Sequence, residues 1–120
     1  MAEAQIVPAT MEMIRSLHAD LPKTVRAIAA VEGERVLGVA ALYPQEGCLV
    51  LCGVVAPETR AEMKRHRRTL LRCVWTALAI AVRRGMPVVA MADQDIEGSD
   101  RLLLHLGFMP KNGNYQWESR

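Results

Sequence analysis

Residues 54 to 85 constrain the fold more than any other stretch of the chain. Here an apolar run passes through Pro57 into a long segment that ends at Gly85. After the proline, apolar residues recur at three- and four-residue steps or multiples of them, at Met63, Leu70, Val74, Leu78 and Ala81. Proline suits the first turn of a helix, and glycine suits its end. The sequence therefore predicts a buried strand that leads directly into one amphipathic helix.

The first turns of the expected helix carry a dense group of basic residues. Between residues 57 and 84 there are eight basic residues and two acidic ones, which gives a local charge of +6 against −4 for the remainder. A helix start offers free backbone N–H groups and the positive end of the helix dipole, and both attract anions such as phosphate. We expect an anionic ligand or partner here. The alternative is a solvated helix face that binds nothing in particular.

Composition and length narrow the class of protein. The 120 residues are 51% hydrophobic and 23% charged, which is typical of one globular domain spanning residues 1–120. No apolar run approaches the roughly 20 residues that cross a bilayer, and the first residues lack the order of a signal peptide. We therefore expect a cytoplasmic protein, of a cell or of a virus-infected host, with no membrane partner. Cys48, Cys52 and Cys73 form no C-x-x-C pair and indicate reduced, mostly buried thiols rather than a disulfide framework or a metal site.

The remaining segments alternate between strand and helix patterns. Thr10 can cap a short helix that carries Met11, Ile14 and Leu17 on its inner face. Strands are expected at residues 5–7, 25–31, 36–43, 48–55, 86–92, 108–110 and 115–117. A further helix, after the long one, is expected at 99–106. An Asn112-Gly113 dipeptide favours a tight hairpin between the last two strands. The prediction is an α/β (α+β) fold with a mixed sheet of six to seven strands in the order β-α-βββ-α-β-α-β-β.

Four local motifs occur in this order and resemble one known fold. They are IVPAT near the start, EGERVLGVAAL in the expected hairpin, VAPETR before the basic helix, and LLLHLGF near the end. Together they resemble the GCN5-related N-acetyltransferase (GNAT) fold, over nearly the whole chain. The resemblance implies that acetyl-CoA is the cofactor and an amine the acceptor. It also implies that the main-chain edge of Gly53 to Val55 pairs with the pantetheine arm of the cofactor, with Val54 and Val55 as the cofactor-binding residues.

The chain departs from the family pattern at the phosphate-binding turn. In the family, the arginine that matches Arg60 begins R-x-x-G-x-G/A, and here Met63 and Arg65 stand at the two small-residue positions. A bulky residue obstructs close approach to the backbone. Basic side chains could replace the lost backbone contacts by charge-assisted bonds to phosphate. The expected phosphate-binding side chains are Arg60, Lys64, Arg65, Arg67 and Arg68.

The residues that would handle protons are also altered. Many family members carry a tyrosine as general acid where Leu103 stands in this chain. His105 and Tyr115 are the substitute candidates for the acid. Glu58, at the helix entrance, and Glu46 are the candidates for a general base, and the spacing alone does not select between them. Exposed turn carboxylates and a surface histidine are the structural alternatives.

Two further interpretations remain open at this point. The basic helix is similar in pattern to degenerate, catalytically inactive members of the same fold encoded by tailed bacteriophages, including a small internal virion protein. That similarity implies an assembly role, with homo-oligomer or virion partners. The third interpretation is a nucleic-acid-binding module that uses the basic helix. It gains no support from aromatic residues, because none lies among the arginines.

Overall fold

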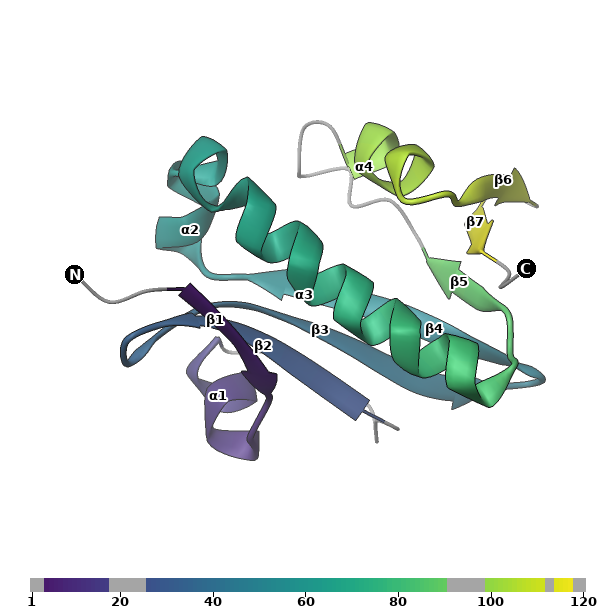
Figure 1. The fold of residues 1–120 in the computed structure, drawn as a ribbon, viewed down its shortest axis with the longest axis horizontal. Helices are drawn as coiled ribbons and strands as arrows, with labels where there is room; N and C mark the ends of the chain where they lie inside the picture. Colours follow the sequence, from purple (N-terminus) through teal and green to yellow (C-terminus); the bar gives the residue numbers. More distant parts are fainter. Residues whose placement is uncertain (1–3, 18–25, 91–98, 112–113, 118–120) are drawn as a thin grey trace.

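The computed structural model describes residues 4–17, 26–90, 99–111 and 114–117 (Figure 1). The first elements are β1 (Ala4–Pro8), α1 (Met11–Ser16), β2 (Arg26–Glu32), β3 (Arg35–Gln45), β4 (Cys48–Val55) and α2 (Pro57–Ala61). They are followed by α3 (Met63–Arg84), β5 (Val88–Ala90), α4 (Ser99–His105), β6 (Met109–Lys111) and β7 (Asn114–Trp117). The predicted strand and helix segments are present in the predicted order, and the expected Asn112-Gly113 turn lies outside the described residues.

The strands form one mixed, seven-stranded sheet in the order β1-β2-β3-β4-β5-β7-β6. β1 to β4 pair antiparallel in chain order. Short turns join β2 to β3 and β3 to β4, whereas α1 lies in the connection from β1 to β2. β4 and β5 pair in parallel, with α2 and α3 in the connection between them. The sheet therefore changes direction at β4, and the long helix returns the chain across one sheet face (Figure 1).

α3 covers one face of the sheet and α1 covers part of the other. The larger core cluster joins Ala77 and Leu78 of α3 to Ile28 and Ala30 of β2. The smaller cluster joins Ile14 of α1 to Ala29 and Val31 of β2 and to Val39 of β3. The alternation follows from the two-residue period of a strand.

Thr10 caps α1 as predicted, since its Oγ1 accepts the Met13 N–H at 3.2 Å. The inner position expected for Met11 is wrong, because this side chain is 65% exposed.

A β-bulge in β3 fixes the chain where β4 turns into α2. Ala30 pairs with Gly38 and Val31 pairs with Val36, so Leu37 is an extra residue on β3. The Leu37 carbonyl accepts the N–H of Ala56, the N-cap residue of α2, at 3.0 Å. The bulge therefore anchors the strand-to-helix turn at which the site is expected.

The prediction of one continuous helix from Pro57 to Gly85 is wrong. Glu62 leaves helical geometry, with φ −117° and ψ 41°, and divides the segment into the five-residue α2 and the 22-residue α3. The two predicted ends are nevertheless correct: Pro57 lies in the first turn of α2, and Gly85 ends α3 with a left-handed φ of 64°. The basic residues from Lys64 onward therefore begin a second helix with an N-terminus of its own.

The C-terminal part packs against the same core as α3. Leu103, Leu106 and Phe108 are buried in the larger cluster, with Tyr115 and Trp117 packed against them. Gly107 has a φ of 98°, and a Cβ at this position would lie 3.3 Å from the Trp117 Nε1. Glycine is therefore required both for the turn and for the approach of the indole ring. Among the described residues, no helix combines the length and apolar character needed to cross a membrane.

Candidate functional site

The edge of β4 beyond Leu51 is the first part of the candidate site. β5 pairs with β4 at Leu49, Val50 and Leu51, and its described residues end there at Ala90. The Leu49 N–H donates to Pro87 O at 2.9 Å, toward β5, whereas the Ala56 N–H donates toward β3. Backbone groups of a strand alternate sides. Gly53 and Val55 therefore direct their N–H and C=O groups toward the β5 side, where the described strand has ended.

The sheet face at Gly53, beside this edge, is exposed. Among the described residues, a Cβ built on Gly53 would find only the Val39 carbonyl, at 3.9 Å. Val54 was expected to contribute together with Val55, but its carbonyl faces Gly38 on β3. The strand can therefore present hydrogen-bonding groups to an extended ligand through Gly53 and Val55, as an added strand would use them.

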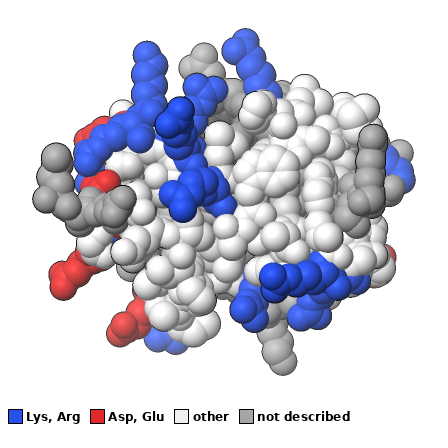
Figure 2. Space-filling model, in the orientation of Figure 1, with Lys and Arg blue, Asp and Glu red and all other residues white. Residues whose placement is uncertain are grey.

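The second part of the candidate site is the junction between α2 and α3. The N-cap residues Ala56 and Glu62 make no side-chain capping hydrogen bond. The N-terminus of α3 therefore has its positive dipole end without a capping side chain. Arg60, Lys64, Arg67 and Arg68 are all exposed here. Figure 2 shows a group of basic side chains over this end of α3 and a second group near the other end, with an uncharged surface between them.

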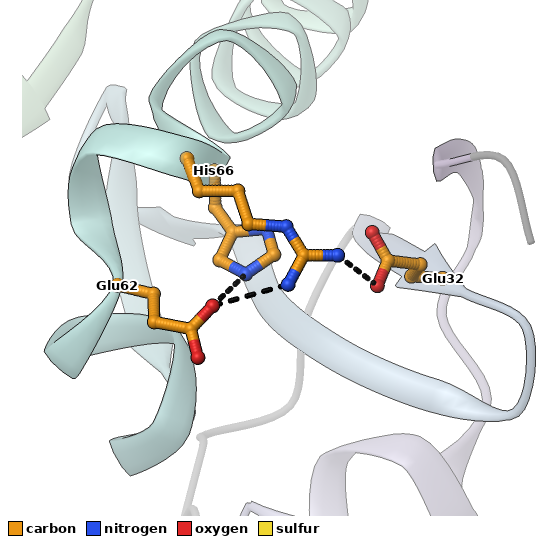
Figure 3. Close-up of polar contacts among 4 residues, drawn as sticks. Glu32, Glu62 and His66 are labelled. Atoms are coloured by element: carbon orange, nitrogen blue, oxygen red, sulfur yellow. Dashed lines mark hydrogen bonds and ion pairs between the residues drawn. The ribbon is translucent and has the colours of Figure 1, made fainter. Parts of the chain in front are cut away.

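Arg65 differs from its basic neighbours because it is already paired with two carboxylates. Its Nη1 lies 3.1 Å from Glu62 Oε2, and its Nη2 lies 3.1 Å from Glu32 Oε1 on β2 (Figure 3). The expectation for Arg65 was a phosphate contact. In the structure its guanidinium instead bridges the start of α3 to the end of β2, 33 residues earlier in the chain.

His66 is a buried polar residue that the sequence reasoning did not select. It is 2% exposed, and its Nε2 lies 3.9 Å from Glu62 Oε2, which is beyond hydrogen-bond distance (Figure 3). Thr59 of α2 is fully buried, and neither its Oγ1 nor His66 Nε2 has a hydrogen-bond partner among the described residues. A signal for His66 existed in the sequence. The inner stripe of α3 is its row of buried residues, which includes Cys73, Ala77 and Ala81. His66 lies seven residues before Cys73, so it continues this stripe toward the start of the helix.

The four candidate proton-handling residues lie on separate parts of the fold, and Glu46 is exposed in the turn between β3 and β4. Glu58 is exposed in the first turn of α2, His105 is exposed at the end of α4, and Tyr115 is half-buried on β7. Leu103, at the place of the family's tyrosine, is buried in the core at 7% exposure. Their proposed roles remain predictions.

Burial disfavours the thiolate form of Cys52 and Cys73. Cys52 lies on β4 next to Gly53 and is half-buried, and this burial raises the pKa of its thiol. A raised pKa keeps the sulfur protonated, whereas a nucleophile must be a thiolate. Cys73 is buried on the inner side of α3, as expected, whereas Cys48 and Cys52 are less buried than predicted. Within residues 4–17, 26–90, 99–111 and 114–117, no group of three potential ligands could hold a metal ion.

Comparison with known proteins gives a fold but no sequence family. No family model matches the chain, and no curated protein matches its sequence. A chain from Acinetobacter baylyi that is provisionally assigned as an acetyltransferase superposes with a TM-score of 0.71 at 14% identity, covering 99% of this chain and 94% of that chain. A GNAT-family acetyltransferase from Brucella melitensis, in complex with acetyl-CoA, gives 0.64 at 16% identity, covering 100% and 90%.

A third similar structure is a chain of a KacTA complex with DNA. Its TM-score is 0.54 at 18% identity, with 97% of this chain and 93% of that chain covered. At these identities the likeness concerns the arrangement of the backbone and not the chemistry of the site. The backbone of this chain, with its mixed seven-stranded sheet, superposes on these chains over nearly their full length. This protein therefore has the GCN5-related N-acetyltransferase fold.

Proposed function

We propose that the chain is one cytoplasmic domain that binds acetyl-CoA and transfers its acetyl group to an amine. The observation that carries this proposal is the backbone edge of Gly53 and Val55, beyond the end of the described part of β5, beside a basic helix N-terminus. The same fold holds acetyl-CoA in the Brucella melitensis structure. Acetyl-CoA, when bound, supplies a thioester that an amine can attack.

The residues at the site suit the pantetheine arm of the cofactor through the backbone of β4. They suit its pyrophosphate only through basic side chains that take the place of backbone contacts. The edge of β4 offers alternating N–H and C=O groups, which suit the amide groups of a pantetheine arm. The turn at Met63 and Arg65 lacks the small residues of the family, so close backbone contact to a pyrophosphate is obstructed. Exposed guanidinium and ammonium groups at Arg60, Lys64 and Arg67 replace it by charge-assisted hydrogen bonds.

Acetyl transfer to an amine requires one proton to leave the nitrogen and one to reach the departing sulfur. Glu58 is proposed to accept the first proton, and His105 or Tyr115 to supply the second. Most of the expected rate comes from holding the amine beside the thioester. A proton donor or acceptor in position adds about 100- to 10,000-fold.

Calorimetric titration with acetyl-CoA and with coenzyme A tests the proposal. Wild-type protein should bind either ligand with 1:1 stoichiometry. The double substitution Arg67→Ala/Arg68→Ala should weaken binding by about tenfold or more, since hydrogen bonds to charged groups contribute about 1.5 to 3 kcal/mol. The matched control is Arg83→Ala/Arg84→Ala, which removes the same charge from the opposite end of α3. Equal losses in the two variants, or no heat at millimolar ligand, would reject a phosphate site at the start of α3.

A second candidate function is nucleic-acid binding, which the basic group over the start of α3 favours (Figure 2). Binding to a short duplex should then weaken steeply with salt, and Arg67→Ala/Arg68→Ala should reduce the salt dependence. A catalytically inactive assembly protein, as in the phage members that the sequence resembles, is the remaining alternative. It predicts stable self-association, measured by sedimentation, in protein that binds neither coenzyme A nor nucleic acid.

A further inference from the structure

Glu62 places a negative charge at the start of α3, where the proposed function needs a ligand phosphate. It is the N-cap residue of α3 and the only acidic residue within the basic run from Arg60 to Arg68. Its side chain makes no capping hydrogen bond to the backbone. The carboxylate turns instead toward Arg65 and the edge of the His66 ring (Figure 3). An anion near a helix N-terminus is stabilised by the dipole, and here the protein supplies that anion itself.

The consequence for Arg65 is a guanidinium neutralised from two sides. Glu62 and Glu32 each lie 3.1 Å from one of its terminal nitrogens. The two contacts differ in exposure. The Glu32 side chain is 20% exposed, whereas those of Glu62 and Arg65 are 50% and 55% exposed. The contact to Glu62 is therefore the one that solvent, or a competing anion, can reach.

His66 indicates that the contact with Glu62 is incomplete. Its Nε2 is buried and has no hydrogen-bond partner among the described residues, and the carboxylate beside it stops at 3.9 Å. A buried polar nitrogen without a partner carries an energetic cost that an acceptor at closer range would remove. A phosphate oxygen that takes the place of the Glu62 carboxylate can come within reach of both His66 Nε2 and Arg65 Nη1.

We propose that Glu62 is a displaceable counter-anion that makes the start of α3 selective for multiply charged phosphate ligands. This inference rests on the proposed phosphate site. A ligand with one negative charge gains little by exchanging places with a carboxylate that already carries one. A pyrophosphate group brings more charge than it displaces, and it can pair with Arg65 and with exposed neighbours such as Lys64 and Arg67 at the same time.

The test compares Glu62→Gln with wild type, using inorganic pyrophosphate and inorganic phosphate as probes. The substitution keeps the shape of the side chain and removes its charge. Exposed ion pairs of this kind are worth little, so pyrophosphate affinity should rise by up to about fivefold. Phosphate affinity should rise by at least the same factor, because no carboxylate then competes with this less highly charged ligand for Arg65. Glu62→Asp, which draws the carboxylate away from Arg65, should fall between the two.

The matched control is Glu34→Gln, which removes the same charge from the exposed turn between β2 and β3. It should leave pyrophosphate affinity near the wild-type value. A ¹⁵N spectrum of the histidine side chains gives a second measurement, since saturating pyrophosphate should shift the His66 Nε2 signal in wild-type protein. The inference is overturned if Glu62→Gln fails to gain pyrophosphate affinity over both wild type and Glu34→Gln, including the case in which none of them binds.

Coenzyme A titrations of the same variants separate this inference from the proposed function. Wild-type binding of coenzyme A with no pyrophosphate gain in Glu62→Gln would leave the proposed function standing and reject the role of Glu62. A pyrophosphate gain in Glu62→Gln without any coenzyme A binding would support the counter-anion and reject the proposed cofactor.

Discussion

The two ends of the inner stripe of α3 bury different kinds of surface. From Cys73 onward the helix places Ala77, Leu78 and Ala81 against apolar residues of β2 and β3. At its first turn the same stripe buries His66, and α2 adds the buried Thr59 beside the junction. The first arrangement is what a stable core requires. The second leaves two polar atoms without partners among the described residues, which lowers stability.

The contrast shows where the fold gives up stability. The N-terminal end combines a helix break, an uncapped N-terminus, buried polar atoms and several cations at the positive end of the dipole. Each of these features is unfavourable on its own. The C-terminal end has Arg83 and Arg84 in the last turn, where cations are favourable, and the left-handed Gly85 cap. A bound anion would reverse the balance at the N-terminal end and has no such effect at the other.

Alkaline titration should give the largest effect, at the apolar part of the stripe. Burial raises the pKa of the Cys73 thiol to about 11 from an ordinary value of 9.0, and a backbone hydrogen bond at Ala40 opposes the shift in part. Between these values the unfolded chain loses the proton and the folded chain keeps it. The free energy of unfolding should therefore fall as the pH rises from about 9 to 11, by roughly 2 to 3 kcal/mol from this thiol.

Urea unfolding of wild type and Cys73→Ala across this range measures the contribution, because other titrating groups are common to both proteins. The variant loses packing at every pH but should show a flatter alkaline slope. Cys52→Ala should remove a smaller part of the slope, since burial also raises the pKa of that thiol. Parallel slopes for wild type and Cys73→Ala would contradict the buried, protonated thiol.

A pair of glycine substitutions tests the boundary between the packed stripe and the open edge. A Cβ at Gly38 would lie 3.0 Å from Val54 O and 3.1 Å from Leu70 Cδ2, whereas Gly53 has open space around it. Gly38→Ala should lower the free energy of unfolding by about 1 to 3 kcal/mol, because the carbonyl cannot move away. Gly53→Ala should change it by less than about 0.5 kcal/mol. Thermal unfolding checks both, and equal effects would contradict the close approach of α3 to the sheet at Leu70.

Replacing His66 should give a small change in stability but an informative one. His66→Leu removes a buried nitrogen without a partner and extends the apolar stripe, so the free energy of unfolding should rise by about 1 kcal/mol. Pyrophosphate affinity should fall in the same variant. Cys73→Leu is the control at the packed end, where overfilling should destabilise the protein and leave anion affinity unchanged. A His66→Leu protein that is both less stable and unaltered in binding would show that the imidazole serves packing alone.

Local sequence signals predicted most of the backbone but only part of the site. The strand runs, the Thr10 cap and the two ends of the α2–α3 segment follow from hydrophobic period, capping and the backbone preferences of proline and glycine. The basic cluster was visible for the same reason, since charge is a property of the sequence. The prediction for Met11 failed at the first residue of the six-residue α1, which is exposed, whereas Ile14 one turn later is buried.

By itself, the sequence determined the order of strands and helices, the strand-to-helix turn at Pro57 and the charge at the start of the long helix. These are set by interactions within a few residues along the chain. Only the tertiary structure decided that the helix breaks at Glu62, that His66 is buried, and that Arg65 pairs with Glu32 from β2. It also decided that the backbone groups of Gly53 and Val55 lie beyond the described part of β5, which pairs with β4 from Leu49 to Leu51. Those features depend on which distant segments pack together. The hydrophobic period and the composition of the sequence do not determine that packing.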